Sequence, residues 1–303
     1  MASYIFFFLA GSVYALEQKN QPKIAGEIFG VPVPIGNYYF AKRVVLTFNA
    51  SWRPVPRDEQ QLEDLVWQEL IFSYEAFRRG IEATPQEIDE RIDKILKAEK
   101  VNFDWRKNKK VFETWCKKRL GVSPEVFRNE IAHLIKLEKL RRQVIDSFHP
   151  HVTEDEAYKK FLDEYNTLSV ELVQFDDLDE AKKFYSQVKK NPSLWEKRKE
   201  SNPKEFRRPG FVALDFLIHM WGFRREDAYK MLKTKIDDFY PPSPIYRGYG
   251  VFKILKVRRA KPEDFNKRKE YYFERVETIK KYEKYKEWVK KLIEDANIKV
   301  YIE

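Results

Sequence analysis

The chain has 303 residues, enough for two or three domains, and 43% of them are hydrophobic, which suffices for ordinary buried cores. Its net charge is +10, but acidic and basic residues are mixed almost everywhere, which argues against a nucleic-acid binder with one concentrated basic face. With only 3 Met, 4 His and 1 Cys, the chain excludes an internal disulfide and resembles thermophile proteins in composition.

The first fifteen residues have the pattern of a secretory signal peptide. An apolar run from Tyr4 to Leu9 is followed by small residues, and Ala15 offers a signal-peptidase site. No Lys or Arg precedes the apolar run, so a buried N-terminal strand is the alternative. We expect residues 1–15 to direct export. Elsewhere no apolar run approaches the roughly 20 residues of a membrane span, so we expect no stable membrane insertion.

The next part of the sequence predicts mainly helices. Residues 24–48 indicate a strand, a turn at Gly30 and a second segment that is extended or helical. Apolar side chains then recur at helical spacing over 61–79, and Gly80 is typical of the residue that follows a helix.

Two capping boxes and one Ser-Pro pair mark further helix starts. Thr84-Pro85-Gln86-Glu87 combines an N-cap, a proline in the first turn and a glutamate three residues on, and Thr153-Glu154-Asp155-Glu156 repeats the capping pattern. Ser123-Pro124 begins a helix that His149-Pro150 ends. Residues 61–165 are therefore predicted to form a helical bundle.

The pattern changes at Thr167 to a mixture of strands and helices. The predicted elements are a strand over 168–175, helices over 178–190 and 194–199, a short strand at 209–212, a helix over 224–234, a rigid proline loop at 241–244 and a strand over 248–257. This order suits a small α+β domain with an antiparallel sheet covered by helices.

The last forty residues return to helix. The segment 262–297 carries one apolar stripe, which a single helix cannot bury alone, and IKVYIE at the end indicates a short strand. We therefore expect this helix to pack on the helices of 61–165, which makes the small domain an insertion.

The ordered series of these segments resembles the SurA-type periplasmic chaperones and related parvulin-type foldases. Gly30-Val31-Pro32-Val33 is similar to the turn before the family's first helix, residues 65–144 follow its helical pattern, and residues 168–260 resemble one parvulin domain. The resemblance implies an α+β fold, with a mainly helical chaperone module and an inserted parvulin-like domain. The implied domains are 16–165, 166–261 and 262–303, the last completing the first.

The resemblance also points to a degenerate catalytic site. Parvulins lower the barrier of roughly 18–20 kcal/mol to rotation about a peptide bond, using an apolar proline slot above two histidines and an acid or thiol. The histidine positions correspond here to Val170 and Lys253 and the acid or thiol position to Pro203, while Leu217 and Phe223 correspond to the slot. Valine makes no side-chain hydrogen bond and lysine only donates, so we predict that isomerase activity is lost or weak.

Three functions follow from this resemblance. The first is an ATP-independent holdase chaperone in the periplasm, a monomer or dimer without cofactors, that binds unfolded polypeptides, including outer-membrane proteins. The alternative is an active peptidyl-prolyl cis–trans isomerase in which Lys253 replaces a histidine. The third is a scaffold that captures an envelope partner through the small domain.

Three other groups of residues were weighed for chemistry. His149 and His151 offer two metal ligands, but no third ligand is near in sequence, so we interpret them as part of a polar linker. Asp215 and His219 lie four apart, which favours a surface pair on a helix over an acid–base couple. Cys116 has no visible base, so we expect a small buried residue and not a reactive thiol. Aromatic residues make up 16% of the chain. We expect most of them to be buried in the hydrophobic cores and some to line a groove for unfolded polypeptide.

Overall fold

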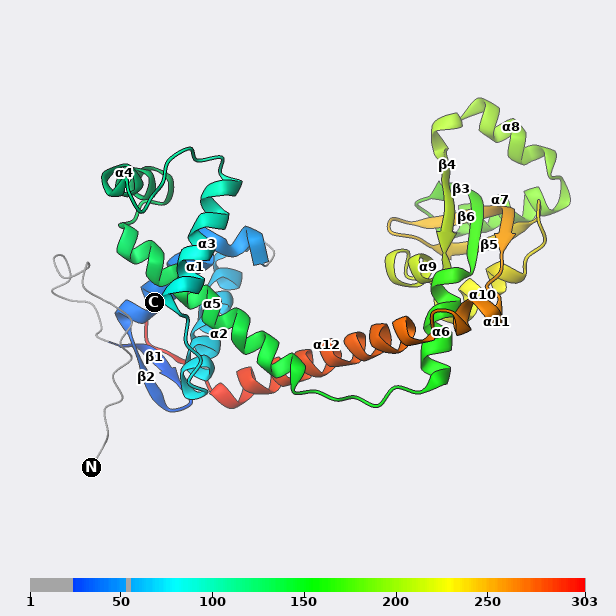
Figure 1. Cartoon of the computed structure of the whole chain (residues 1–303). Coiled ribbons are helices and arrows are strands. Elements are labelled where there is room, and N and C mark those ends of the chain that lie inside the picture. The colour runs from blue at the N-terminus through cyan, green and yellow to red at the C-terminus, as the bar shows by residue number, and fades with distance from the viewer. Residues whose placement is uncertain (1–23, 53–55, 303) are drawn as a thin grey trace. The chain divides into compact units, whose positions relative to one another are not determined.

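The computed structural model describes residues 24–52 and 56–302 (Figure 1). The predicted signal peptide, residues 1–15, lies outside the described residues. The chain divides into two compact units: the first holds the chain up to residue 149 together with 281–303, and the second holds 150–280. The second unit is thus inserted in the sequence of the first, as we expected for the small α+β domain.

These boundaries differ from the expected ones at 165/166 and 261/262. The first boundary lies earlier in the chain because α6 (Glu154–Tyr165) packs within the second unit, and the second lies later because residues up to 280 belong to that unit. Its Phe161 is buried against Phe265 and Tyr272. Asn166, which follows α6, accepts a hydrogen bond from Leu214 N through its carbonyl (3.0 Å) and another from Ala260 N through its side chain (2.9 Å).

The first unit is mainly helical. Its elements are β1 (Ile24–Ile28), β2 (Val31–Pro34), α1 (Ile35–Trp52), α2 (Glu59–Arg78), α3 (Pro85–Ala98), α4 (Lys109–Leu120), α5 (Pro124–Asp146), the end of α12 (Lys269–Ala296) and β7 (Lys299–Val300). Two of the predicted helix ends are confirmed. The Thr84 capping box is complete at the start of α3, and Gly80 follows α2 with φ +65°.

The two ends of the chain meet in this unit. β1 pairs antiparallel with β2 on one side and with β7 on the other. A side chain at position 26 would lie 2.1 Å from Lys299 O, so Gly26 permits this close pairing. Leu292 and Ala296 of α12 are buried in the same core as Trp67 of α2, which confirms the expected packing for the end of the C-terminal helix. Its start lies in the second unit, where Tyr272 is buried against Phe161.

The second unit is built on a four-stranded antiparallel sheet of order β4-β3-β6-β5. Its elements are α6, β3 (Thr167–Phe175), α7 (Leu178–Lys190), α8 (Ser193–Ser201), a 3₁₀ turn (Pro203–Glu205), β4 (Phe206–Ala213), α9 (Leu214–Met220), α10 (Arg225–Lys233), β5 (Phe239–Pro244), β6 (Tyr249–Arg258), α11 (Pro262–Asn266) and the start of α12. The predicted strands and helices from 168 to 234 are present, and β4 is longer than expected.

Three local predictions differ from the structure. The predicted proline loop at 241–244 is part of β5, because β5 is an edge strand and an edge position tolerates residues without an N–H. The segment 214–220 forms the helix α9. The sequence did not predict this helix directly, although the expected pairing of Asp215 with His219 required one. The long helix expected over 262–297 is interrupted by a turn at 267–268, so that α11 and α12 are separate. No helix in the described ranges is both long and apolar enough to cross a bilayer.

Candidate functional site

The two faces of the second unit's sheet carry different cores. One face packs on α9 and α10 and includes Val170, Leu217 and Phe223, which are buried together. The other face packs on α7 and α8 around Trp195. The structure therefore brings together one predicted degenerate position and both predicted slot residues, and all three are side chains of a closed core, at most 4% exposed.

The structure does not bring Lys253 to this group. Val170 lies opposite Ile254 in the β3–β6 register, and Lys253 lies opposite Glu171. Residues opposite each other on paired strands share a face, so Lys253 belongs to the face of α8, where its ammonium lies 2.9 Å from the carboxylate of Glu196. Pro203 is exposed at the start of the 3₁₀ turn. Three positions that the resemblance grouped into one site are thus separated.

The face around Val170 offers little acid–base chemistry. The half-buried Tyr229 packs against this core and donates its hydroxyl to the buried Asp163 at 3.1 Å. Among the buried hydrophobic residues of the core in the described chain, Tyr240 carries the one hydroxyl. That hydroxyl donates to the backbone oxygen of Asp227 at 2.9 Å, and burial raises the pKa of Tyr240 to about 12. A phenol that is already bonded and remains protonated at neutral pH does not supply the pair of imidazoles that the resemblance led us to look for.

The opposite face holds a charged network centred on Glu171, which is 1% exposed. Its carboxylate accepts hydrogen bonds from Trp195 Nε1 (2.8 Å), Arg208 Nε (2.6 Å) and Lys199 Nζ (2.7 Å). Burial raises the pKa of Glu171, but the bonds from Lys199, Trp195 and Arg208 outweigh burial and hold this pKa below its usual value. The network holds α8 against β3 and links β3 to the neighbouring strand β4.

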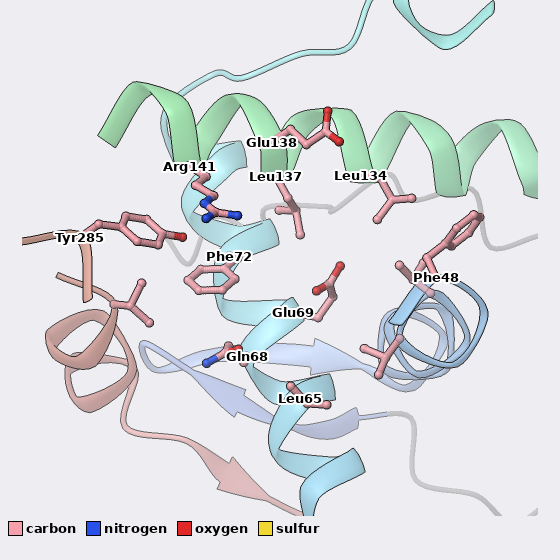
Figure 2. Close-up of a pocket in the computed structure, with 13 residues that line it drawn as sticks. Phe48, Leu65, Gln68, Glu69, Phe72, Leu134, Leu137, Glu138, Arg141 and Tyr285 are labelled. Atoms are coloured by element: carbon pink, nitrogen blue, oxygen red, sulfur yellow. The ribbon is translucent and has the colours of Figure 1, made fainter. Parts of the chain in front are cut away.

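The first unit contains an apolar cavity of about 370 Å³ between four helices (Figure 2). Both ends of the chain contribute to its wall, since α1, α2 and α5 line it together with α12. The lining residues are Val44, Val45, Phe48, Leu65, Gln68, Glu69, Phe72, Leu134, Leu137, Glu138, Arg141, Tyr285 and Val289. Phe48, Leu65, Phe72, Leu137 and Val289 are half-buried, so the apolar lining is accessible from outside.

The polar groups of this cavity are held at its wall. Glu69 shares a 2.8 Å hydrogen bond with His133, and both side chains are buried. Glu138 makes two hydrogen bonds to Arg91, and the guanidinium of Arg141 lies 5.8 Å from the ring centre of Tyr285. Figure 2 shows Leu134 and Leu137 from α5 facing Phe72 and Leu65 from α2 across the space. The cavity can therefore receive apolar side chains.

A second pair, with a buried carboxylate and a half-buried guanidinium, lies one turn from His133 on α5. Glu130 is bonded to Arg43 of α1, with Nε 2.5 Å from Oε1. Burial raises the pKa of Glu130, although the charge of Arg43 acts in the opposite direction. Glu69, Glu130 and His133 are not among the residues predicted from the sequence. Glu130 and His133 lie three apart on the apolar face of α5, and that spacing was the available signal. Ionisable side chains are rare on such a face unless they are hydrogen-bonded inside the core.

The other residues that the sequence singled out are a helix pair, a cysteine and possible metal ligands. Asp215 and His219 form a pair on α9 at 3.3 Å, and Lys160 Nζ lies 2.6 Å from the same carboxylate, which confirms a surface pair. Cys116 is buried, which confirms the expected burial, and burial raises the pKa of its thiol to about 11. Within residues 24–52 and 56–302, no three or more Asp, Glu, His or Cys side chains gather as metal ligands.

No protein-family model and no curated protein matches this sequence. The fold is similar to that of PrsA foldases and SurA-like chaperones. PrsA of Bacillus anthracis, a peptidylprolyl isomerase, is 18% identical, with 78% of this chain and 99% of that chain covered and a TM-score of 0.45. One of the two SurA-like chaperones PEB4 and Cj1289 of Campylobacter jejuni is 15% identical, with 93% and 100% covered and a TM-score of 0.39. PrsA of Bacillus cereus is 15% identical, with 90% and 92% covered and a TM-score of 0.43.

Proposed function

We propose that this protein is a holdase chaperone that binds unfolded polypeptides through the apolar cavity of its first unit. The single observation that carries the proposal is the cavity of about 370 Å³ with half-buried apolar side chains on helices from both ends of the chain. A volume of this size is typical of sites that hold a ligand group, here one or two apolar side chains.

The energetics suit reversible capture. Burying one large apolar side chain contributes about 1.5–3 kcal/mol, so a client that fills the cavity at one point is held weakly and released without ATP. The lining makes few polar demands on a client, since the carboxylate of Glu69 is bonded to His133 and that of Glu138 to Arg91, which leaves Gln68 and Arg141 as its other polar side chains besides Tyr285. Selection by apolarity and not by sequence is what a holdase needs.

The test is suppression of aggregation by variants matched in chemistry. Leu137→Trp fills the cavity from a half-buried position, whereas Leu46→Trp adds the same side chain at a position that is 60% exposed and does not line the cavity. With an unfolded β-barrel protein and an unrelated unfolded enzyme as clients, we expect wild type and Leu46→Trp to suppress light scattering at a stoichiometric ratio, and Leu137→Trp to lose most of the effect. Equal activity of the two variants would exclude the cavity, and an inactive wild type would exclude the function.

We further propose that isomerase activity is lost, which the apolar surroundings of Val170 support. A protease-coupled assay on Xaa-Pro peptides, with an active parvulin as the positive control, should give no rate above background. A clear rate abolished by Lys253→Ala would restore the alternative, an active peptidyl-prolyl cis–trans isomerase.

Export and client identity are part of the same proposal. The apolar run and Ala15 support cleavage of residues 1–15 and action in the periplasm on outer-membrane proteins. Cell fractionation followed by N-terminal sequencing of the purified protein tests this. A mature N-terminus at Leu16 in the periplasmic fraction is expected, and an uncleaved chain in the cytoplasm would contradict the proposal.

A further inference from the structure

A second cavity, of about 690 Å³, lies on the other side of α2 in the first unit. Its wall is formed by α1, the first turns of α2, the end of α12 and the C-terminal strand. The lining residues are Tyr38, Tyr39, Lys42, Glu59, Gln60, Glu63, Asp64, Trp67, Gln68, Ile71, Ile293, Ile298, Val300 and Ile302. Unlike the cavity in Figure 2, this one combines apolar side chains with three carboxylates on one side.

The strand beside this cavity has a free hydrogen-bonding edge. β7 is the last strand of the sheet β2-β1-β7, and no other strand of the described chain pairs with it. Tyr301 N donates to Ala25 O at 2.9 Å, so residue 301 points its backbone groups toward β1. Because these groups alternate along a strand, the N–H and C=O of Val300 point outward, away from β1.

The side chains of β7 and of the residues on either side of it define a binding face. Ile298, Val300 and Ile302 are spaced two apart and line the cavity together. Val300 is 51% exposed, so the edge is accessible to another chain. A strand added at this edge would place its alternate side chains over the cavity.

The acidic side chains at the start of α2 determine which charge a bound polypeptide should carry. Lys42 Nζ lies 2.8 Å from Glu63 and compensates that carboxylate. Glu59 and Asp64 are both exposed, and the carboxylate of Asp64 accepts a hydrogen bond from the neutral amide of Gln60 at 2.9 Å. The start of α2 therefore presents uncompensated negative charge next to an apolar surface.

We propose that the outer edge of β7 binds an extended polypeptide segment with apolar residues at alternate positions and a Lys or Arg beside them, as an added strand over this cavity. The site is separate from the cavity of the proposed function. A second copy of this chain is disfavoured as the occupant, because a two-fold pairing of the same edge would bring two acidic surfaces together.

Fluorescence anisotropy with labelled ten-residue peptides tests the proposal on the full chain. The first peptide alternates Val with Thr and ends in two Lys; the second replaces both Lys with Glu; the third is the Lys peptide N-methylated on alternate amides. We expect binding of the first, at least tenfold weaker binding of the second, and loss of binding for the third because its backbone cannot pair.

Matched variants locate the site. Val300→Pro removes the outward N–H and Val300→Thr keeps it, so we expect about tenfold weaker binding for the proline variant and a change within about twofold for threonine. The double variant Glu59→Gln with Asp64→Asn should weaken the Lys peptide about fivefold, an effect that 1 M salt removes. Leu137→Trp should leave peptide binding unchanged, which separates this site from the chaperone cavity.

Four results would overturn the proposal. Equal binding by the proline and threonine variants, or equal binding of the N-methylated peptide, would exclude strand addition at this edge. Stronger binding after removal of residues 1–23 would make that segment the occupant. A lower sedimentation coefficient for Val300→Pro than for wild type would make a second copy the occupant.

Discussion

Replacing Glu171 tests what fixes the helix α8 to the sheet of the second unit. Glu171→Leu removes the acceptor of three hydrogen bonds, from Trp195, Lys199 and Arg208. The Trp195 ring is fully buried, so its N–H cannot reach water, whereas Lys199 and Arg208 are 30% and 59% exposed and can be rehydrated. The three donors therefore contribute unequally.

The magnitude follows from this exposure. A buried donor left without an acceptor costs about 1–3 kcal/mol. Each of the two exposed ion pairs contributes about 0–1 kcal/mol after solvent screening. We expect Glu171→Leu to lower the free energy of unfolding of this unit by about 2–4 kcal/mol. Glu171→Gln should cost less, because its amide oxygen still accepts from Trp195, and the control Glu196→Gln should cost about 0.5 kcal/mol or less at its exposed pair with Lys253.

The pH dependence gives a second readout. The pKa of Glu171 is lower in the folded unit than its ordinary value of 4.5, so its contribution to stability is fully present above the unfolded pKa and is lost as pH falls through the folded pKa. The difference between wild type and Glu171→Gln should therefore be constant near neutral pH and shrink in acid. Urea-dependent hydrogen exchange of β3 amides measures the second unit alone. A pH-independent difference, or an equal cost for Glu196→Gln, would refute the assignment.

Four further changes probe other elements. Lys253→Ala should leave both stability (within about 1 kcal/mol) and peptide isomerisation unchanged in urea titration and the protease-coupled assay, because its pair is a surface pair. Val170→His places an unpartnered imidazole in a closed core, so a loss of about 2–4 kcal/mol and no gain of isomerase rate are expected; a stable, active variant would contradict this. Cys116 should react with a thiol reagent only after denaturation, because burial raises its pKa to about 11; rapid labelling of the native chain would show otherwise. Thr84→Ala should cost about 1 kcal/mol by removing the N-cap of α3, seen as faster exchange of its first-turn amides and not of those in α6.

Elements with local signals could be predicted from the sequence. The capping boxes at Thr84 and Thr153 are complete in the structure, and α7 has the predicted bounds of 178–190. These signals depend on bonds between residues three or four apart, so no knowledge of the tertiary structure is needed. The docking of the C-terminal helix was also predictable, because an isolated amphipathic helix requires a partner surface.

The cavities could not be predicted in the same way. Glu69 and His133 are 64 positions apart and meet only because α2 and α5 pack together. The edge strand β5 was hidden by its prolines, which exclude an inner strand but not an outer one. In each case the deciding interaction is between segments distant in sequence, and neither periodicity nor turn chemistry reports it.

The position of Lys253 shows why a matched segment does not fix a site. In a regular strand, residues 253, 255 and 257 would share one face, and Val257 does pack on the core that contains Val170. The β3–β6 register shifts between Ser169 and Val170, where Lys256 and then Ile254 are the partners, so one extra residue is inserted in β6. The bulge moves Ile254 onto the face of Val170 and turns Lys253 toward Glu196. A single inserted residue, invisible to the alignment of 254–257, thus separates the two positions on which any family-like catalytic pair would depend.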